Sequence, residues 1–130
     1  MHGQPFSDHF RSRYSEQFRE YFEMERYSGE IDNATLTVKA ENEVCGDVAQ
    51  LQISNDGKIV IKVLGCPPSV AAINLLAEII EKKELDLKKM DADKIVAMLG
   101  GLPSTKKHAA HLACDLLRRY LKHPHSPETR

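Results

Sequence analysis

Aromatic residues recur at every fourth position near the start of the chain, at Phe10, Tyr14, Phe18 and Phe22, with arginine and glutamate between them. Residues four apart share one face of a helix, so this pattern predicts an amphipathic helix over residues 7–25. The aromatic stripe is expected to pack in the core of the domain. The alternative is a face that binds a partner.

The apolar period changes to two after a turn at residues 28–33. Three short runs, 34–40, 47–54 and 58–64, alternate or are almost wholly apolar and are rich in β-branched residues, which predicts three strands. The dipeptide Asp56-Gly57 lies between the second and third runs and favours a two-residue hairpin turn. We therefore expect these two strands to pair antiparallel.

Helical patterns follow the strands. They predict a helix from an N-cap at Ser69 to Lys83, a shorter helix capped by Asp91 and stopped by Gly100-Gly101, and a final helix that starts near His108. Strands followed by helices indicate an α+β fold with a three-stranded antiparallel sheet covered by helices. We expect a single domain over residues 1–122 and a flexible tail over residues 123–130.

Composition narrows the function classes. The chain has 130 residues, 42% hydrophobic and 28% charged, which is typical of one globular domain. The 18 basic and 19 acidic residues give a net charge of −1, which argues against nucleic acid as a partner. The absence of a long apolar run or a secretory signal argues against a membrane and favours a cytoplasmic protein. Three scattered cysteines fit reduced thiols better than a disulfide framework.

The hairpin register brings candidate ligands together. If Asp56-Gly57 is a two-residue loop, Asp47 lies opposite Cys66, and Cys45 shares their face because residues two apart on a strand point the same way. Two sulfur atoms and a carboxylate would then converge. A three-residue loop would put Cys66 on the other face unless a bulge restored it.

These residue types suit a metal ion or sulfur chemistry. Gly46 and Gly65 adjoin the two cysteines and let the backbone bend, and a helix N-terminus after Cys66 favours its thiolate. A tetrahedral metal needs a fourth ligand, for which His108 and His111 are the candidates. Alternatively, the cysteines are inert core residues or form a cross-strand disulfide. For Cys114, core packing is the expected role.

Three segments carry a resemblance to a known family. Glu41 to Asp47 (ENEVCGD), Val63 to Pro67 (VLGCP) and Leu102 to Ala109 (LPSTKKHA) resemble, in order and spacing, the ligand segments of the IscU/NifU-type iron–sulfur cluster assembly scaffolds. The resemblance covers about residues 14–121 and implies the SufE/NifU-like fold. It also implies a non-enzymatic scaffold that assembles a [2Fe–2S] cluster from iron and sulfur.

The resemblance assigns roles residue by residue. It implies that Cys45, Asp47, Cys66 and His108 bind the cluster, iron or zinc, and that the partners are a cysteine desulfurase and apo iron–sulfur proteins. The family's third ligand cysteine is replaced here by Ala109. The family's chaperone motif Leu-Pro-Pro-Val-Lys reads Leu-Pro-Ser-Thr-Lys at residues 102–106, which argues against a dedicated chaperone contact.

Two further functions compete with the scaffold. One is a sulfur-acceptor protein that resembles SufE, stimulates a cysteine desulfurase through one reactive cysteine and needs no metal. The other is a zinc-stabilised interaction domain without assembly activity. With two cysteines, an aspartate and a histidine, the predicted site would hold zinc well and a cluster less securely.

Overall fold

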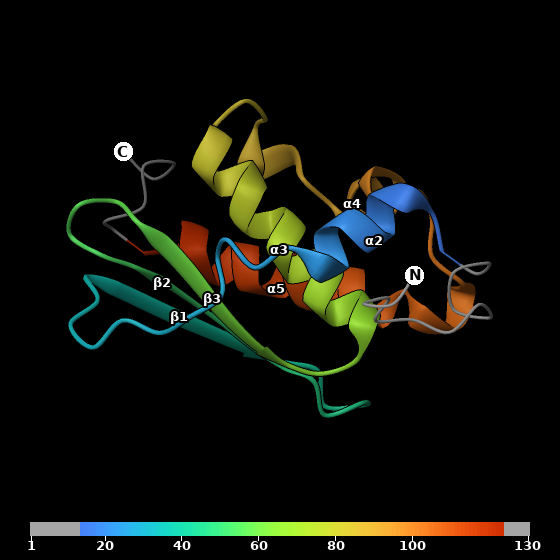
Figure 1. Ribbon diagram of the computed structural model, residues 1–130, viewed down its shortest axis with the longest axis horizontal. Helices are drawn as coiled ribbons and strands as arrows, with labels where there is room; N and C mark the ends of the chain where they lie inside the picture. Colours follow the sequence, from blue (N-terminus) through green and yellow to red (C-terminus); the bar gives the residue numbers. More distant parts are fainter. Residues whose placement is uncertain (1–13, 124–130) are drawn as a thin grey trace, which may run out of the picture.

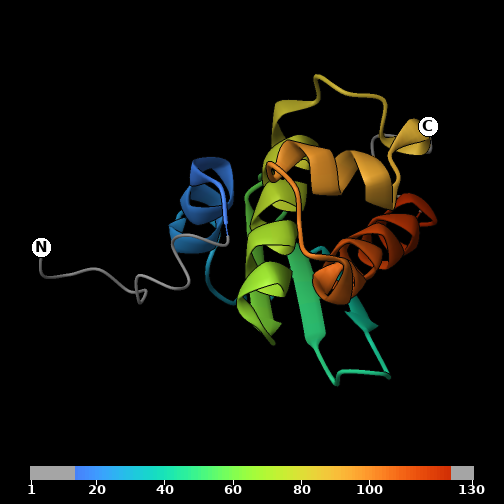
Figure 2. The same cartoon turned by 90° about the vertical axis from the view of Figure 1, so that its right-hand side faces the viewer.

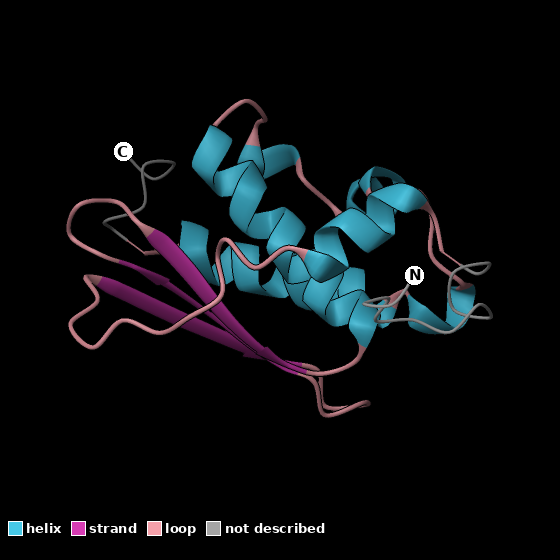
Figure 3. Ribbon diagram, in the orientation of Figure 1, coloured by secondary structure: helices cyan, strands magenta, loops and turns pink. Residues whose placement is uncertain are grey.

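The computed structural model describes residues 14–123 and has two layers, a sheet and a set of helices that cover one of its faces (Figures 1 and 3). The elements follow the chain as α2 (Glu16–Glu23), β1 (Leu36–Glu41), β2 (Val48–Ile53), β3 (Ile59–Leu64), α3 (Pro67–Lys82), the 3₁₀ helix η1 (Leu87–Lys89), α4 (Ala92–Met98), the 3₁₀ helix η2 (Ser104–Lys106) and α5 (His108–Leu121). This arrangement confirms the predicted α+β fold. Within residues 14–123, no helix has the length and apolar character needed to cross a membrane.

The three strands pair antiparallel in the order β1-β2-β3, as predicted. The prediction of a two-residue hairpin turn is wrong, because Ile53 pairs with Ile59 and residues 54–58 connect the strands. Side-chain hydrogen bonds build this longer turn: Ser54 bonds Asp56 and also accepts the amide of Lys58 at 3.0 Å. The ladder is therefore shifted by one residue from the predicted register.

Helix α3 forms the centre of the core. The sheet, α2 and α5 all pack against it (Figure 2), so most of its residues are buried and the apolar stripe is wide. Leu75, Leu76 and Ile73 have no exposed surface, and neither does Leu51 of β2. Burial of such side chains supplies the main driving force for folding. The core therefore fixes the ends of α3, one of which carries a cysteine.

Helix α2 is shorter than predicted. It begins after Ser15, whose hydroxyl accepts the amide of Phe18 at 3.0 Å, so Tyr14 precedes the helix. Phe18 is completely buried and stacks on Tyr14 and Phe22, with ring centroids 4.2 and 6.3 Å apart. This confirms core packing for the described part of the stripe. Phe10 and the rest of residues 7–13 lie outside the described residues, as do residues 124–130 of the predicted tail.

The later helices begin and end where the sequence indicates. Asp91 caps α4 by accepting the amide of Lys94 at 2.9 Å. Gly100 and Gly101 follow this helix with φ of +79° and +99°, conformations that glycine adopts without strain. The chain then runs through η2 into α5, which confirms the predicted final helix.

The outer edge of β3 is covered by the segment that follows α2. Ser28 forms a parallel bridge with Ile61, whose amide donates to the carbonyl of Tyr27 at 2.6 Å. On the sheet face away from the helices, Gln52 exchanges hydrogen bonds with the backbone of Ile31 at 2.8 and 3.0 Å. The segment around residues 27–31 thus covers the edge at β3 and part of the open face at β2.

Candidate metal centre

Cys45 lies in the loop between β1 and β2. Asn42 organises this loop, since its Oδ1 accepts the amides of Val44 at 3.0 Å and Cys45 at 3.3 Å. The backbone turns back at Gly46, where φ is +78°. Cys45 is exposed, so its thiol can be reached from solvent.

Asp47 follows at the start of β2 and is only 6% exposed. Because Val48 pairs with Leu64, the ladder places Gly65 beside Asp47, where Cys66 was expected. The buried hydroxyl of Ser69 donates a hydrogen bond of 2.5 Å to Oδ2 of Asp47. The carboxylate is thus held in one orientation.

Cys66 occupies the N-cap position of α3. The prediction that Ser69 caps this helix is wrong, because the cap lies three residues earlier, at Cys66, and Pro67 and Pro68 are in the first turn. Proline fits there since its φ is helical and the first helical positions need no amide donor. Ser69 consequently lies inside the first turn, and its hydroxyl is available to Asp47.

Cys66 reaches Asp47 by a route that the strand arithmetic does not describe. Strand β3 ends at Leu64, so Cys66 lies beyond the ladder and the alternation of faces no longer applies to it. Its Sγ donates to Oδ2 of Asp47 at 3.2 Å. The predicted register is wrong by one residue. The turn into α3 nevertheless brings Sγ of Cys66 and the carboxylate of Asp47 together.

His108 completes the group from the other end of the chain. It is the first residue of α5, and its Nε2 lies 3.4 Å from Sγ of Cys66 and 3.7 Å from Oδ2 of Asp47. His111 is exposed and lines a hollow with Glu41 and Asn42 whose lining contains no cysteine. Cys114 is 3% exposed and lies in the core. Of the two candidate histidines, the structure places His108 against the cysteine.

Cys45, Asp47, Cys66 and His108 together form what we call the centre. One ligand atom from each of Cys45, Asp47 and His108 lies within 4.8 Å of the others, and Cys66 contacts both Asp47 and His108. Figure 2 shows the β1–β2 loop and the first turns of α3 and α5 at the same end of the molecule. Segments far apart in the sequence thus meet at one point.

Burial and hydrogen bonding shift the pKa values of Asp47 and Cys66 in the centre. Burial acts to raise the pKa of Asp47, but hydrogen bonds from Ser69, Cys66 and Cys45 outweigh it and hold that pKa below its usual range. Burial raises the pKa of the Cys66 thiol, and the neighbouring Asp47 adds to this effect. The expectation that Cys66 favours its thiolate is therefore wrong for the metal-free protein, in which the thiol donates to the carboxylate.

The donor set fits a metal ion of borderline softness. Two sulfurs, a carboxylate oxygen and an imidazole nitrogen are all established zinc ligands, and four of them match tetrahedral coordination. Sulfur ligands also suit iron–sulfur clusters. The positive N-terminal ends of α3 and α5 point to this group and favour the negative charge that deprotonated cysteines and Asp47 would carry.

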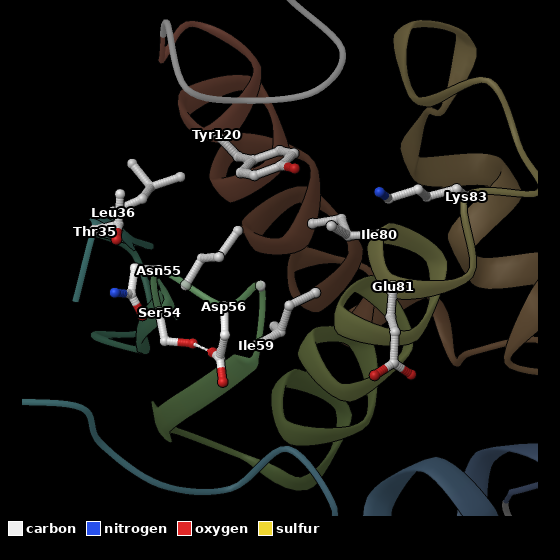
Figure 4. Close-up of a pocket in the computed structure, with 12 residues that line it drawn as sticks. Thr35, Leu36, Ser54, Asn55, Asp56, Ile59, Ile80, Glu81, Lys83 and Tyr120 are labelled. Carbon is white, nitrogen blue, oxygen red and sulfur yellow. Dashed lines mark hydrogen bonds between the residues drawn. The ribbon is translucent and has the colours of Figure 1, made fainter.

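A larger hollow lies at another place in the fold. It has a volume of about 520 Å³ and is formed by the β2–β3 turn, the start of β1 and the ends of α3 and α5 (Figure 4). Leu36, Ile59, Ile80 and Tyr120 line it, and Asp56 lies beside them. Its described lining contains no cysteine or histidine, so the candidate chemistry stays at the centre.

The sequence gives no sign of two residues that support the centre. Ser69 looks like a helix cap, and Asn42 looks like an ordinary loop residue. Both act through side-chain hydrogen bonds to residues 22 or 66 positions away, which leave no periodic pattern. The one local signal is that Asn42 precedes Gly46 in a short loop, where asparagine often bonds the next amides.

Comparisons with known proteins identify similar sequences. The family model described as "NifU-like N terminal domain" matches residues 13–125. The iron-sulfur cluster assembly scaffold protein IscU of Haemophilus influenzae is 30% identical over 113 residues, which cover 81% of this chain and 90% of that protein. The bifunctional protein NifU/MnmA of Rubrobacter xylanophilus is 30% identical over 114 residues, which cover 82% of this chain and 23% of that longer protein.

A solved structure shares the fold. The crystal structure of an iron-sulfur cluster assembly scaffold protein for the SUF system from Fervidobacterium islandicum AW-1 superposes with a TM-score of 0.56. The match covers 86% of this chain and 97% of that chain, at 20% sequence identity. The two proteins therefore share an overall fold.

Proposed function

Because the chain belongs to the family of NifU-like N-terminal domains, we propose that it is an iron–sulfur cluster assembly scaffold whose centre holds iron, a [2Fe–2S] cluster or zinc. The proposed ligands are Cys45, Asp47, Cys66 and His108. The protein is proposed to act as a carrier and not as an enzyme. Its proposed partners are a cysteine desulfurase, which supplies sulfur, and apo-proteins, which receive the cluster.

One observation carries this proposal. Sγ of Cys66 and Nε2 of His108 lie 3.4 Å apart although 42 residues separate them in the sequence. Sulfur, imidazole nitrogen and carboxylate oxygen are all ligands of zinc, so their convergence from different elements supports a metal site. The exposure of Cys45 adds a thiol that both iron and a sulfur donor can reach.

Ala109 limits how a cluster can be held. The position that carries a third thiolate in the resembled scaffolds is here an alanine without exposed surface. A cluster in this protein would need Asp47 and His108 as its other two ligands, since clusters are held by four protein groups and prefer thiolates. Sulfur would be accepted by Cys45 or Cys66. We expect weaker retention of a cluster than of zinc.

Anaerobic reconstitution tests the proposal. The purified chain is incubated with ferrous iron, cysteine and a cysteine desulfurase, and visible absorption, iron and acid-labile sulfide are measured. The scaffold proposal expects absorption of a [2Fe–2S] cluster in the wild type and its loss in Cys66→Ser. A wild-type protein that takes up neither cluster, iron nor zinc would exclude the proposal.

A zinc-stabilised interaction domain is the second candidate, and Ala109 favours it. Such a protein would bind zinc at the same four residues and gain no cluster during reconstitution. A SufE-like sulfur acceptor would need no metal and would stimulate the desulfurase. The metal content of freshly purified protein separates the SufE-like protein from the other two, and reconstitution separates the scaffold from the zinc domain.

A further inference from the structure

Asn42 uses all of its polar groups within the loop and its surroundings. Its amide donates to the carbonyl of Asp47 at 2.8 Å, and its own carbonyl accepts the amide of Gly46 at 2.7 Å. Its Oδ1 accepts the amides of Val44 and Cys45. These bonds close the backbone of residues 42–47 into one compact turn.

The same side chain also reaches another element. Nδ2 of Asn42 donates to the backbone carbonyl of His108 at 3.5 Å, which is a bond across 66 residues of sequence. Asn42 is half-buried between the loop and α5. One amide group thus contacts the backbone of a proposed sulfur ligand on one side and the backbone of the proposed imidazole ligand on the other.

We propose that Asn42 is a positioning residue that joins the Cys45 loop to the start of α5 and so keeps Cys45 and His108 at a shared metal. The inference rests on the proposed function for the identity of the ligands. Without this link, Cys45 is held by the bonds within its exposed loop and by its contact with Asp47, and Asn42 no longer joins the loop to α5. With it, the loop and α5 form one frame, and metal binding loses less conformational freedom.

Two substitutions separate the two contacts. In Asn42→Ala both are lost. In Asn42→Ser the hydroxyl can still accept the loop amides, as serine does in comparable turns, but it is too short to reach the carbonyl of His108 and adds no charge. Asn55→Ser, in the exposed β2–β3 turn, is the matched control for an asparagine far from the centre.

Zinc affinity and the Co²⁺ spectrum test the link. Competition with a chelator measures affinity, and the thiolate-to-Co²⁺ charge-transfer band reports whether Cys45 is a ligand, with Cys45→Ser as reference. We expect both Asn42 variants to bind zinc about 10–100-fold more weakly and to lose part of that band, as for other groups that orient ligands. Asn55→Ser should match the wild type.

The outcomes also separate this inference from the proposed function. If Asn42→Ser equals the wild type while Asn42→Ala is weaker, the turn alone matters and the link to His108 is excluded. If both variants equal the wild type, the whole inference is wrong, although the proposed function stands. If the wild type binds no metal, the proposed function fails, and ¹⁵N relaxation of residues 43–46 in the metal-free proteins decides the link: unchanged order in Asn42→Ser would overturn it.

Discussion

Gly65 leaves the space that Asp47 occupies. A Cβ atom on Gly65 would lie 2.6 Å from Cγ of Asp47 and 2.9 Å from its Oδ1, distances that non-bonded atoms do not tolerate. Glycine is thus required at position 65 because a larger residue would occupy the space of the Asp47 side chain. Its φ lies outside the left-handed region, so backbone strain is not the reason.

Gly65→Ala should displace the Asp47 carboxylate and weaken metal binding. We expect zinc affinity to fall by at least about tenfold, since the methyl group and the carboxylate cannot both keep their places. Competition with a chelator measures this. Gly57→Ala in the β2–β3 turn is the control: its φ of +87° makes the substitution strained, but the turn is far from the centre, so affinity should not change. Equal affinities in all three proteins would contradict the steric argument.

Cys66→Ser and Cys114→Ser should behave in opposite ways. Cys66→Ser removes one of only two proposed sulfur ligands, so the protein should lose stoichiometric zinc. Cys114→Ser should keep zinc but lose about 1–3 kcal/mol of unfolding free energy, because it places a hydroxyl in the core. Metal analysis and chemical denaturation are the measurements. Zinc retained in Cys66→Ser, or lost in folded Cys114→Ser, would show that the ligand set is wrong.

Ser69→Ala should weaken zinc binding without unfolding the chain. The hydroxyl orients Asp47, so affinity should fall about 10–100-fold; the lost hydrogen bond to the buried carboxylate should also cost about 1–3 kcal/mol of stability, which leaves the chain folded. Isothermal titration of the metal-free protein measures the former and thermal unfolding the latter. Ser28→Ala, at an exposed position, serves as the control. An unchanged affinity would mean that Asp47 needs no support from Ser69.

Tyr21 makes the stability of the fold decrease as the pH rises in the alkaline range. Burial raises its pKa well above the usual value of about 10, and the hydrogen bond to Glu78 adds to this effect. A group whose pKa is raised by folding contributes stability below its unfolded pKa and loses that contribution as pH rises. We expect Tyr21→Phe to cost about 0.5–1.5 kcal/mol at pH 8 and less above pH of about 10. Denaturant midpoints between pH 8 and 11 measure it. A difference between the two proteins that does not change with pH would contradict this reasoning.

The elements of the fold could be predicted because each depends on short-range pattern. The alternation after residue 34 marks the strands, and Asp91 with Gly100 marks the ends of α4. The β2–β3 register could not, since the hydrogen bonds of Ser54 outweigh the preference of Asp56-Gly57 for a two-residue turn. A shift of one residue in the pairing moves the side chains of a strand to the other face of the sheet. The residues predicted to form the strand stay the same.

The members of the centre could be predicted, but their arrangement could not. Motif spacing singles out Cys66 and His108, and the structure brings them together; their role as ligands remains a prediction. The position of Cys66 at the start of α3 depends on Pro67 and Pro68, which move the cap away from Ser69. The supporting contacts of Ser69 and Asn42 arise only once the elements pack, so no local rule identifies them.

The covering of β3 by Ser28 decides where the sheet could be extended. With one edge blocked by the preceding segment, β1 is the outer strand that keeps an open side in the described part of the chain. Its outward residues include Lys39 and Glu41. Such charges hinder the pairing of this edge strand with the edge strand of a second molecule. A molecule built this way can leave the thiol of Cys45 open to solvent at one end while its sheet resists aggregation along its length.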